Sequence, residues 1–191
     1  MPQLPPFNAD GLLPVGDYPM TAEELLQSHL VAGGPEFPTW DEAWRVQLVR
    51  NLAVLADQLR DVGIDNIFID GSFTEAKDHP NDIDGYVECT RDFLVSGALE
   101  TELNLRDRHR VWTWSPHSRR RYHGYAKPQL PMWHVYRVEL YPHMIDAPQP
   151  CGIRDRHGNE LEFPAAFRLS RGDQPRGIVQ LIQESSGNDP N

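Results

Sequence analysis

The stretch GSFTEAKDHPNDID, residues 71–84, decides the fold because it connects two segments that the sequence predicts to be strands. NIFID, residues 66–70, precedes it and is rich in isoleucine, while DIDGYVEC, residues 82–89, alternates apolar and polar residues. Short runs of this kind, bounded by turn residues, are typical of β-strands. We therefore predict a strand, a loop and a second strand.

The second predicted strand begins with two aspartates, Asp82 and Asp84, that flank a single isoleucine. Residues two apart on a strand project from the same face, so these carboxylates are expected to lie side by side. Two neighbouring carboxylates repel one another unless a cation lies between them. Mg²⁺ prefers oxygen ligands and Mn²⁺ accepts the same ones, so the pair predicts a site for either ion.

The loop ahead of the aspartates has the residues of a phosphate-binding turn. Gly71 allows a sharp turn and a close approach of the backbone to a ligand. Backbone N–H groups, the Ser72 hydroxyl and the Lys77 ammonium group can then interact with phosphate oxygens. The Gly-Ser pair alone and the Asp-x-Asp pair alone also occur in ordinary turns, because Gly, Ser and Asp are common turn residues. The two halves together, separated by a short spacer, are more specific.

With these residues the sequence resembles the nucleotidyltransferase superfamily of DNA polymerase β-like enzymes. The resemblance rests on a hydrophobic strand, a Gly-Ser pair, a spacer, and Asp-Ile-Asp at the head of the next strand. The stretches FNADGLLPVGDYPMTAEELL, DGSFTEAKDHPNDID and QPRGIVQL extend it over most of the chain, and are similar to a branch with no known acceptor. Asp70 is a departure, because the wider family usually has an apolar residue before the glycine.

The resemblance implies an α/β fold, with a small mixed β-sheet flanked by helices, and a role for each residue of the motif. Gly71 and Ser72 match the phosphate-binding turn, and Asp82 and Asp84 match the paired metal ligands. The family has a third carboxylate on a later strand, where this chain has Glu139 in RVELY. Glu139 is therefore the candidate for that position, and three other acids compete with it: Glu88, Asp92 and Asp146.

Two capping boxes predict helices ahead of the motif. TAEE, residues 21–24, begins a short helix that ends near Val31. TWDE, residues 39–42, begins a longer helix that ends at Gly63 and carries apolar residues at steps of three and four. Two further predicted elements follow the motif, a helix and a third strand: residues 91–103 and residues 133–141.

The length of 191 residues indicates a single domain, residues 1–191. Residues 1–20 are rich in proline and glycine and lack periodicity, which predicts an irregular arm on the surface. SSGNDPN, residues 185–191, is predicted to be a flexible tail.

Charge and cysteine content restrict the class of protein. The net charge of −10 disfavours general adhesion to nucleic acid by the molecule as a whole. The two cysteines make neither a disulfide framework nor a zinc site, which favours a reducing compartment. The sequence has no apolar run of membrane-spanning length and no secretory signal at its N-terminus. We therefore expect a cytoplasmic protein without a membrane partner.

Six of the sixteen arginines lie between positions 106 and 121, interleaved with two tryptophans. Arginines with aromatic residues can hold phosphates and stack on bases, so Arg119, Arg120 and Arg121 are candidate acceptor-binding residues. A solvated loop whose charge offsets an acidic body explains the same composition equally well.

Together these features predict a Mg²⁺-dependent nucleotidyltransferase that uses a nucleoside triphosphate. It would transfer a nucleoside monophosphate to a hydroxyl group of an acceptor, which could be a protein, an RNA end or a small molecule. Asp82 and Asp84 would bind the metal, and Glu139 would help to position the hydroxyl. Two alternatives remain: a nucleotide-binding sensor without catalysis, and an interaction protein of a two-component toxin or defence pair that binds a partner protein.

Overall fold

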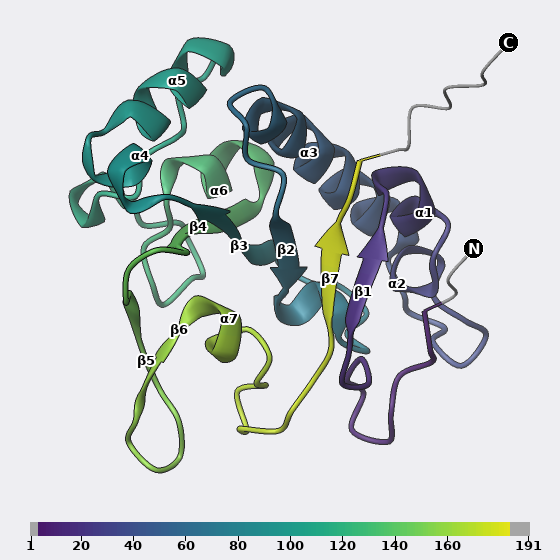
Figure 1. Ribbon diagram of the computed structural model, residues 1–191. Coiled ribbons are helices and arrows are strands. Elements are labelled where there is room, and N and C mark those ends of the chain that lie inside the picture. Colours follow the sequence, from purple (N-terminus) through teal and green to yellow (C-terminus); the bar gives the residue numbers. More distant parts are fainter. Residues whose placement is uncertain (1–3, 184–191) are drawn as a thin grey trace, which may run out of the picture.

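The computed structural model describes residues 4–183, so the predicted tail at residues 185–191 lies outside the described residues. Its centre is a five-stranded sheet with the order β1-β7-β2-β3-β4 (Figure 1). The pairs β1–β7 and β3–β4 are parallel and the other neighbouring pairs are antiparallel. The five strands are β1 (Asp17–Met20), β2 (Ile67–Asp70), β3 (Ile83–Cys89), β4 (Val138–Met144) and β7 (Ile178–Leu181).

Helices and a small hairpin surround this sheet, which confirms the predicted α/β class with a mixed sheet flanked by helices. The hairpin consists of β5 (Pro150–Arg154) and β6 (Glu160–Glu162). The helices of residues 4–183 are α1 (Ala22–Leu26), α2 (His29–Ala32), α3 (Glu42–Arg60), α4 (Arg91–Val95), α5 (Ala98–Arg106), α6 (Pro131–Tyr136) and α7 (Phe163–Ala166). None of these is long and apolar enough to cross a membrane.

The two faces of the sheet differ because side chains alternate along each strand. On β3, Ile83 and Val87 join the main core with α3, which runs behind the sheet in Figure 1. Tyr86 points to the other face, where it packs in a small aromatic cluster with Phe68 and with Phe167, just after α7. Asp84 shares this second face, so the strand register itself keeps its carboxylate out of the main core.

The predicted strand–loop–strand unit is confirmed. β2 and β3 pair antiparallel with Asp70 opposite Asp84, and the loop between them begins with a 3₁₀ turn, η1 (Gly71–Thr74). The long helix ahead of it, α3, carries its predicted apolar stripe, with Leu48, Leu52, Leu55 and Leu59 fully buried. Its N-terminal cap differs from the prediction: Asp41, not Thr39, accepts the Trp44 N–H, at 3.0 Å.

The predicted strand over residues 133–141 is wrong in its first half. Residues up to Tyr136 form helix α6, and β4 begins only at Val138. Pro131 occupies the first turn of α6, where its missing N–H costs nothing. Arg137 ends the helix in a left-handed conformation, with φ of 56°. Glu139 nevertheless lies on a strand, as predicted.

The N-terminal segment is more ordered than the predicted irregular arm. Residues 17–20 form edge strand β1, which pairs parallel with β7. Leu12 and Leu13 are buried, so the segment covers part of the core. The predicted capping box at Thr21 and Glu24 is confirmed, but the short helix divides in two at Ser28. The predicted helix at residues 91–103 divides similarly, at Gly97.

Candidate functional site

Four acidic residues, Asp70, Asp82, Asp84 and Glu139, gather at one end of the sheet. Parallel pairing of β3 and β4 sets Asp84 beside Glu139, and antiparallel pairing of β2 and β3 sets it beside Asp70. Asp82 precedes Asp84 by two residues, at the entrance to β3. The sequence predicted that Asp82, Asp84 and Glu139 would meet, and the strand register brings them together.

The charges of Asp82 and Asp84 are poorly compensated. Burial, then the charges of Asp82, Glu139 and Asp70, raise the pKa of Asp84 well above its usual range. Burial and the nearby Glu139 also raise the pKa of Asp82, against a hydrogen bond that Trp133 Nε1 donates to Asp82 Oδ2 at 2.6 Å. Within residues 4–183 the Asp84 carboxylate accepts no hydrogen bond. A cation between the two carboxylates would relieve this repulsion.

The turn at Gly71 fits closely against Asp84. Gly71 has φ of +80°, a region that side-chain-bearing residues rarely adopt. A Cβ atom at this position would lie only 2.7 Å from Asp84 Oδ2. Glycine therefore permits both the positive φ of the turn and its close approach to the Asp84 carboxylate.

Two pockets meet at this turn. The first, which we call the turn pocket, has a volume of about 250 Å³ and extends from Gly71 toward α7 and the segment before β7. The second, the aromatic pocket, has a volume of about 480 Å³ and extends from Asp82 past Glu139 to Tyr125 and Tyr141. Both pockets are lined by the same four residues where they meet: Ser72, Lys77, Asp84 and Arg171.

The structure brings the predicted phosphate-binding residues to the edge of both pockets. Ser72 and Lys77 line both pockets, and Lys77 and Arg171 supply positive charge that lowers the pKa of Asp82. The fold brings the segment before β7, and Arg171 with it, to this end of the sheet.

Glu139 is held differently from the two aspartates. The residue is 3% exposed, and Glu139 Oε1 accepts the Leu130 N–H at 2.6 Å and lies 3.6 Å from Arg119 Nη1. The Tyr141 hydroxyl donates to Glu139 Oε2. Both oxygens of Glu139 thus have partners from the protein itself.

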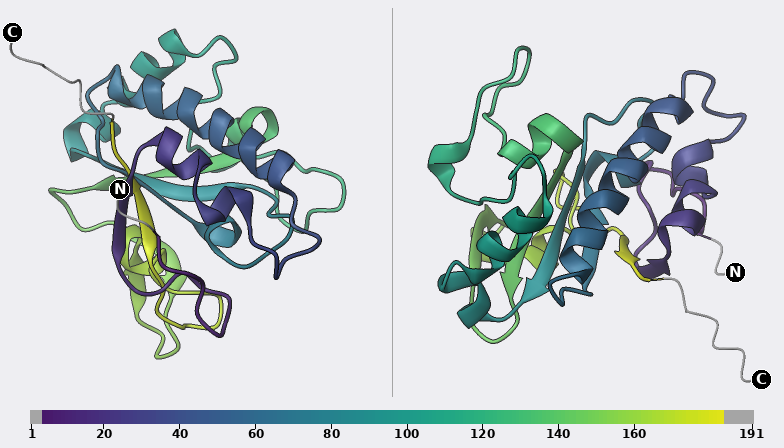
Figure 2. Two further views of the ribbon diagram at one scale, coloured as in Figure 1. Left: turned by 90° about the vertical axis from the view of Figure 1, so that its right-hand side faces the viewer. Right: turned by 90° about the horizontal axis from the view of Figure 1, so that it is seen from above.

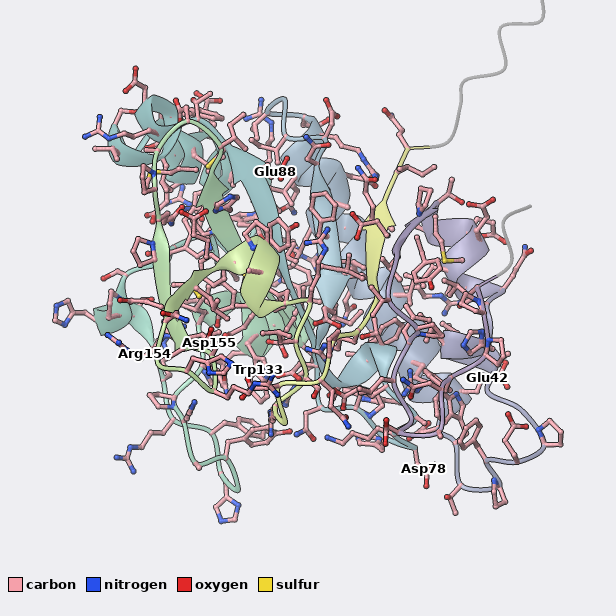
Figure 3. The ribbon with its side chains drawn as sticks, turned by 60° about the horizontal axis from the view of Figure 1, so that its bottom comes forward. Glu42, Asp78, Glu88, Trp133, Arg154 and Asp155 are labelled. Atoms are coloured by element: carbon pink, nitrogen blue, oxygen red, sulfur yellow. The ribbon has the colours of Figure 1, made fainter. Side chains whose placement is uncertain are left out.

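The acids that competed with Glu139 lie elsewhere. Glu88 pairs with His143 at the far end of β3, and Figure 3 shows it well separated from Trp133, whose indole contacts Asp82. Asp92 is in α4, beyond that end of the strand, and Asp146 accepts the Arg91 N–H at the same end.

The carboxylates fit a divalent metal as a pair. Within residues 4–183, no three His, Cys, Asp or Glu side chains are arranged to hold a metal together. The oxygens of Glu139 are turned toward Leu130, Tyr141 and Arg119. Asp82 and Asp84 line the same pocket as Glu139 and offer oxygen ligands of the kind that Mg²⁺ prefers.

Asp70 has a structural partner. It is fully buried and forms an ion pair with Arg176, while Thr74 Oγ1 donates to Asp70 Oδ1 at 2.6 Å. Burial raises the pKa of Asp70 to about 7, although the Arg176 charge opposes this effect. Arg176 also donates to Glu75 Oε1 at 2.6 Å. This network joins the end of β2 to the segment before β7.

Arg45 of α3 holds the loop after the turn, a role that no motif in the sequence indicated. Its guanidinium is fully buried and donates to four backbone carbonyls, three of them in the loop. The bonds to Phe73 O and Lys77 O measure 2.8 and 2.6 Å. The group also stacks 3.7 Å above the Trp40 ring.

The three candidate acceptor-binding arginines separate into two kinds. Arg119 turns inward, where its guanidinium contacts Glu139 and the Tyr141 hydroxyl. Arg120 and Arg121 are exposed. They belong to a long loop between α5 and α6 that projects from the body of the protein in Figure 2.

The chain is similar to one protein family over nearly its whole length. A family model described as "Family of unknown function (DUF6932)" matches residues 5–182. Comparisons with curated proteins and with solved structures found no match. Because the matched region covers almost all of the chain, this protein belongs to the DUF6932 family.

Proposed function

We propose that this protein is a Mg²⁺-dependent nucleotidyltransferase with the fold of DNA polymerase β-like enzymes. The observation that carries the proposal is the position of the Asp84 carboxylate, which lies between Asp82 and the Gly71 turn and lines both pockets. Paired carboxylates beside a phosphate-binding turn supply the metal ligands and the donors that phosphoryl transfer requires.

Different residues of the site would bind the triphosphate and the metal. The Gly71 turn, Ser72 and the cations Lys77 and Arg171 would hold the triphosphate, because donors and positive charge gather there. Asp82 and Asp84 would hold the metal. The aromatic pocket then remains for the acceptor.

The transfer itself is a substitution at phosphorus. When bound, Mg²⁺ neutralises charge on the phosphates and lowers the pKa of the attacking hydroxyl. The hydroxyl oxygen of the acceptor forms a bond to the α-phosphorus, and the bond from that phosphorus to the bridging oxygen breaks. Pyrophosphate leaves with the electron pair, and the hydroxyl proton passes to a carboxylate of the site. Arg119 and Tyr141 keep Glu139 in position beside these groups.

One observation favours a second candidate, a nucleotide sensor without turnover. Glu139 already has a backbone donor, a hydroxyl donor and an arginine as partners, so it can serve as scaffold rather than as a metal ligand. A sensor would bind a nucleoside triphosphate with Mg²⁺ and release it unchanged.

Incubation with each nucleoside triphosphate, labelled at the α-phosphate, tests the proposal. With Mg²⁺ and cell extract, we expect transfer of the label to an acceptor and release of pyrophosphate. Asp84→Asn should abolish both, whereas the exposed control Asp65→Asn should retain them. Binding without pyrophosphate release would favour the sensor, and failure to bind any nucleoside triphosphate would contradict both candidates.

A further inference from the structure

We propose that the acceptor is a single-stranded nucleic acid, bound along residues 108–138 with its terminal hydroxyl in the aromatic pocket. We call residues 108–138 the basic segment. This inference rests on the proposed nucleotidyl transfer, for which it names the class of acceptor.

The basic segment has a charge opposite to that of the whole chain. It carries seven arginine or lysine side chains and no aspartate or glutamate, in a protein with a net charge of −10. The acidic remainder repels a polyanion, so favourable contacts with phosphates concentrate on this segment. The projecting loop in Figure 2 includes much of it, with Arg120, Arg121 and Lys127 exposed.

An aromatic platform lies within the same segment. Tyr122 is 43% exposed, and its ring and that of Tyr125 pack edge-on against Trp133, with centroids 5.1 and 4.9 Å away. The Arg137 guanidinium lies over the platform, 3.8 Å from the Trp133 centroid and 4.4 Å from that of Tyr122. Aromatic rings beside cations are how proteins bind single strands, because every unpaired base has a face that can stack.

The platform is attached directly to the carboxylate site. Trp133 Nε1 donates to Asp82 Oδ2 at 2.6 Å, and the Ile83 N–H donates to the Arg137 carbonyl at 3.0 Å. Tyr125 and Lys127 line the aromatic pocket together with Asp82. A strand held on the platform therefore has its end beside the proposed metal ligands.

These features favour a single-stranded nucleic acid over two other polyanionic partners, a nucleic-acid duplex and an acidic protein. The bases of a duplex are stacked on one another and have no free face for Tyr122. An acidic protein would use the cations of the segment but not the exposed ring of Tyr122. Unpaired RNA and unpaired DNA share the required chemistry, and they differ only at the 2′-hydroxyl.

Fluorescence anisotropy tests the inference, using a short fluorescein-labelled RNA strand, the DNA strand of the same sequence, and their duplexes. EDTA is present and no nucleoside triphosphate is added, so that neither metal nor nucleotide binding is needed. We expect the wild-type protein to prefer single strands, with affinity that falls as salt rises. Arg120→Ala/Arg121→Ala should reduce the slope of log affinity against log salt by about 1.4, as two lost phosphate contacts require.

Tyr122→Ala should weaken binding roughly five- to hundredfold without changing the salt slope, because it removes stacking rather than charge. The matched control, Arg91→Ala/Arg156→Ala, removes two exposed arginines outside the segment and should have no effect. Circular dichroism confirms that each variant is folded.

Several results would overturn the inference: no binding of a single strand, tighter binding of the duplex, an equal loss in the control, or a stable complex with an acidic protein instead. Calorimetry with nucleoside triphosphates on the same protein separates this failure from that of the proposed function. If the nucleotide binds with Mg²⁺ but no single strand binds, the inference about the acceptor is contradicted and the proposed function is not.

Discussion

Gly71 and Asp84 are coupled at the level of single atoms. The turn has a positive φ, and its α-carbon faces the carboxylate so closely that a methyl group would lie 2.7 Å from Oδ2. The conformation of the turn and the position of the proposed metal ligand therefore depend on the same residue.

Gly71→Ala should cost stability in two ways. A residue with a side chain at this φ costs roughly 1–3 kcal/mol, and the clash with Asp84 adds to that cost. Gly97→Ala is the matched control, because Gly97 has φ of +76° but open space around it. Urea unfolding should show a larger loss for Gly71→Ala, together with weaker Mg²⁺-nucleotide binding. Equal losses in the two variants, with binding unchanged, would show that the contact has no functional role.

Asp82→Asn/Asp84→Asn should melt at the same temperature as the wild type or higher when no metal is present. Burial and mutual repulsion raise the pKa of both carboxyls, so the folded state resists their ionisation. The wild type therefore loses stability as pH rises from about 4, where both groups ionise in the unfolded chain. The variant avoids this loss because asparagine does not ionise.

Thermal unfolding across pH measures the effect, with EDTA present. The advantage of the variant should disappear at the acid end of the series, and Mg²⁺ should stabilise only the wild type. Asp10→Asn/Asp65→Asn removes two exposed charges and serves as the control. A double variant of Asp82 and Asp84 that melts clearly lower, yet still binds Mg²⁺-nucleotide, would show that these aspartates are structural.

At the scale of elements, the loop after the turn depends on a helix that is remote in sequence. α3 supplies Arg45, whose guanidinium donates to the carbonyls of Phe73, Glu75 and Lys77. One side chain thus fixes the backbone that carries Ser72 and Lys77.

Arg45→Lys should loosen this loop, because a lysine ammonium lacks the planar fork that reaches several carbonyls. Each buried carbonyl left without a donor costs about 1–3 kcal/mol. Hydrogen exchange should show faster exchange of the Ala76 amide, which is bonded to Gly11 O in the native state. Arg50→Lys, an exposed change in the same helix, should leave exchange and nucleotide affinity unaltered. Unchanged exchange of the Ala76 amide in Arg45→Lys would show that Arg45 does not hold this loop in place.

The elements that local signals determine were predictable from the sequence. The strands on either side of residues 71–82 and the long helix α3 follow from local composition and periodicity. The strand predicted at residues 133–141 was wrong in its first half, because a short segment rich in apolar residues fits a helix or a strand. Here Pro131 in the first turn and the left-handed Arg137 at the end favour a helix. The edge strand β1 was missed because its stability comes from pairing with β7, far away in sequence.

The candidate site was predictable only in part, for a similar reason. Asp82, Asp84, Ser72 and Lys77 belong to one local motif, and the sequence placed them together. The positions of Arg171 and Arg45 depend on contacts across the fold, and no local pattern indicates them. Glu139 is likewise held by hydrogen bonds from the Leu130 N–H and the Tyr141 hydroxyl and by an ion pair with Arg119.

At the scale of the whole molecule, the distribution of charge agrees with the two proposals. An acidic body carries one acid-free basic segment, and that segment borders the pocket that contains the paired carboxylates. A triphosphate would approach these carboxylates only with a cation that offsets their repulsion. Metal dependence of nucleotide binding is therefore the central claim.

Isothermal titration calorimetry with ATP, GTP, CTP and UTP, each with Mg²⁺ and with EDTA, tests that claim most directly. The account predicts binding of at least one nucleotide in Mg²⁺, loss of that binding in EDTA, and loss of it in Asp82→Asn/Asp84→Asn under either condition. The Asp10→Asn/Asp65→Asn control should bind like the wild type. Equal affinity of the wild-type protein in Mg²⁺ and in EDTA would contradict the metal-bridged site.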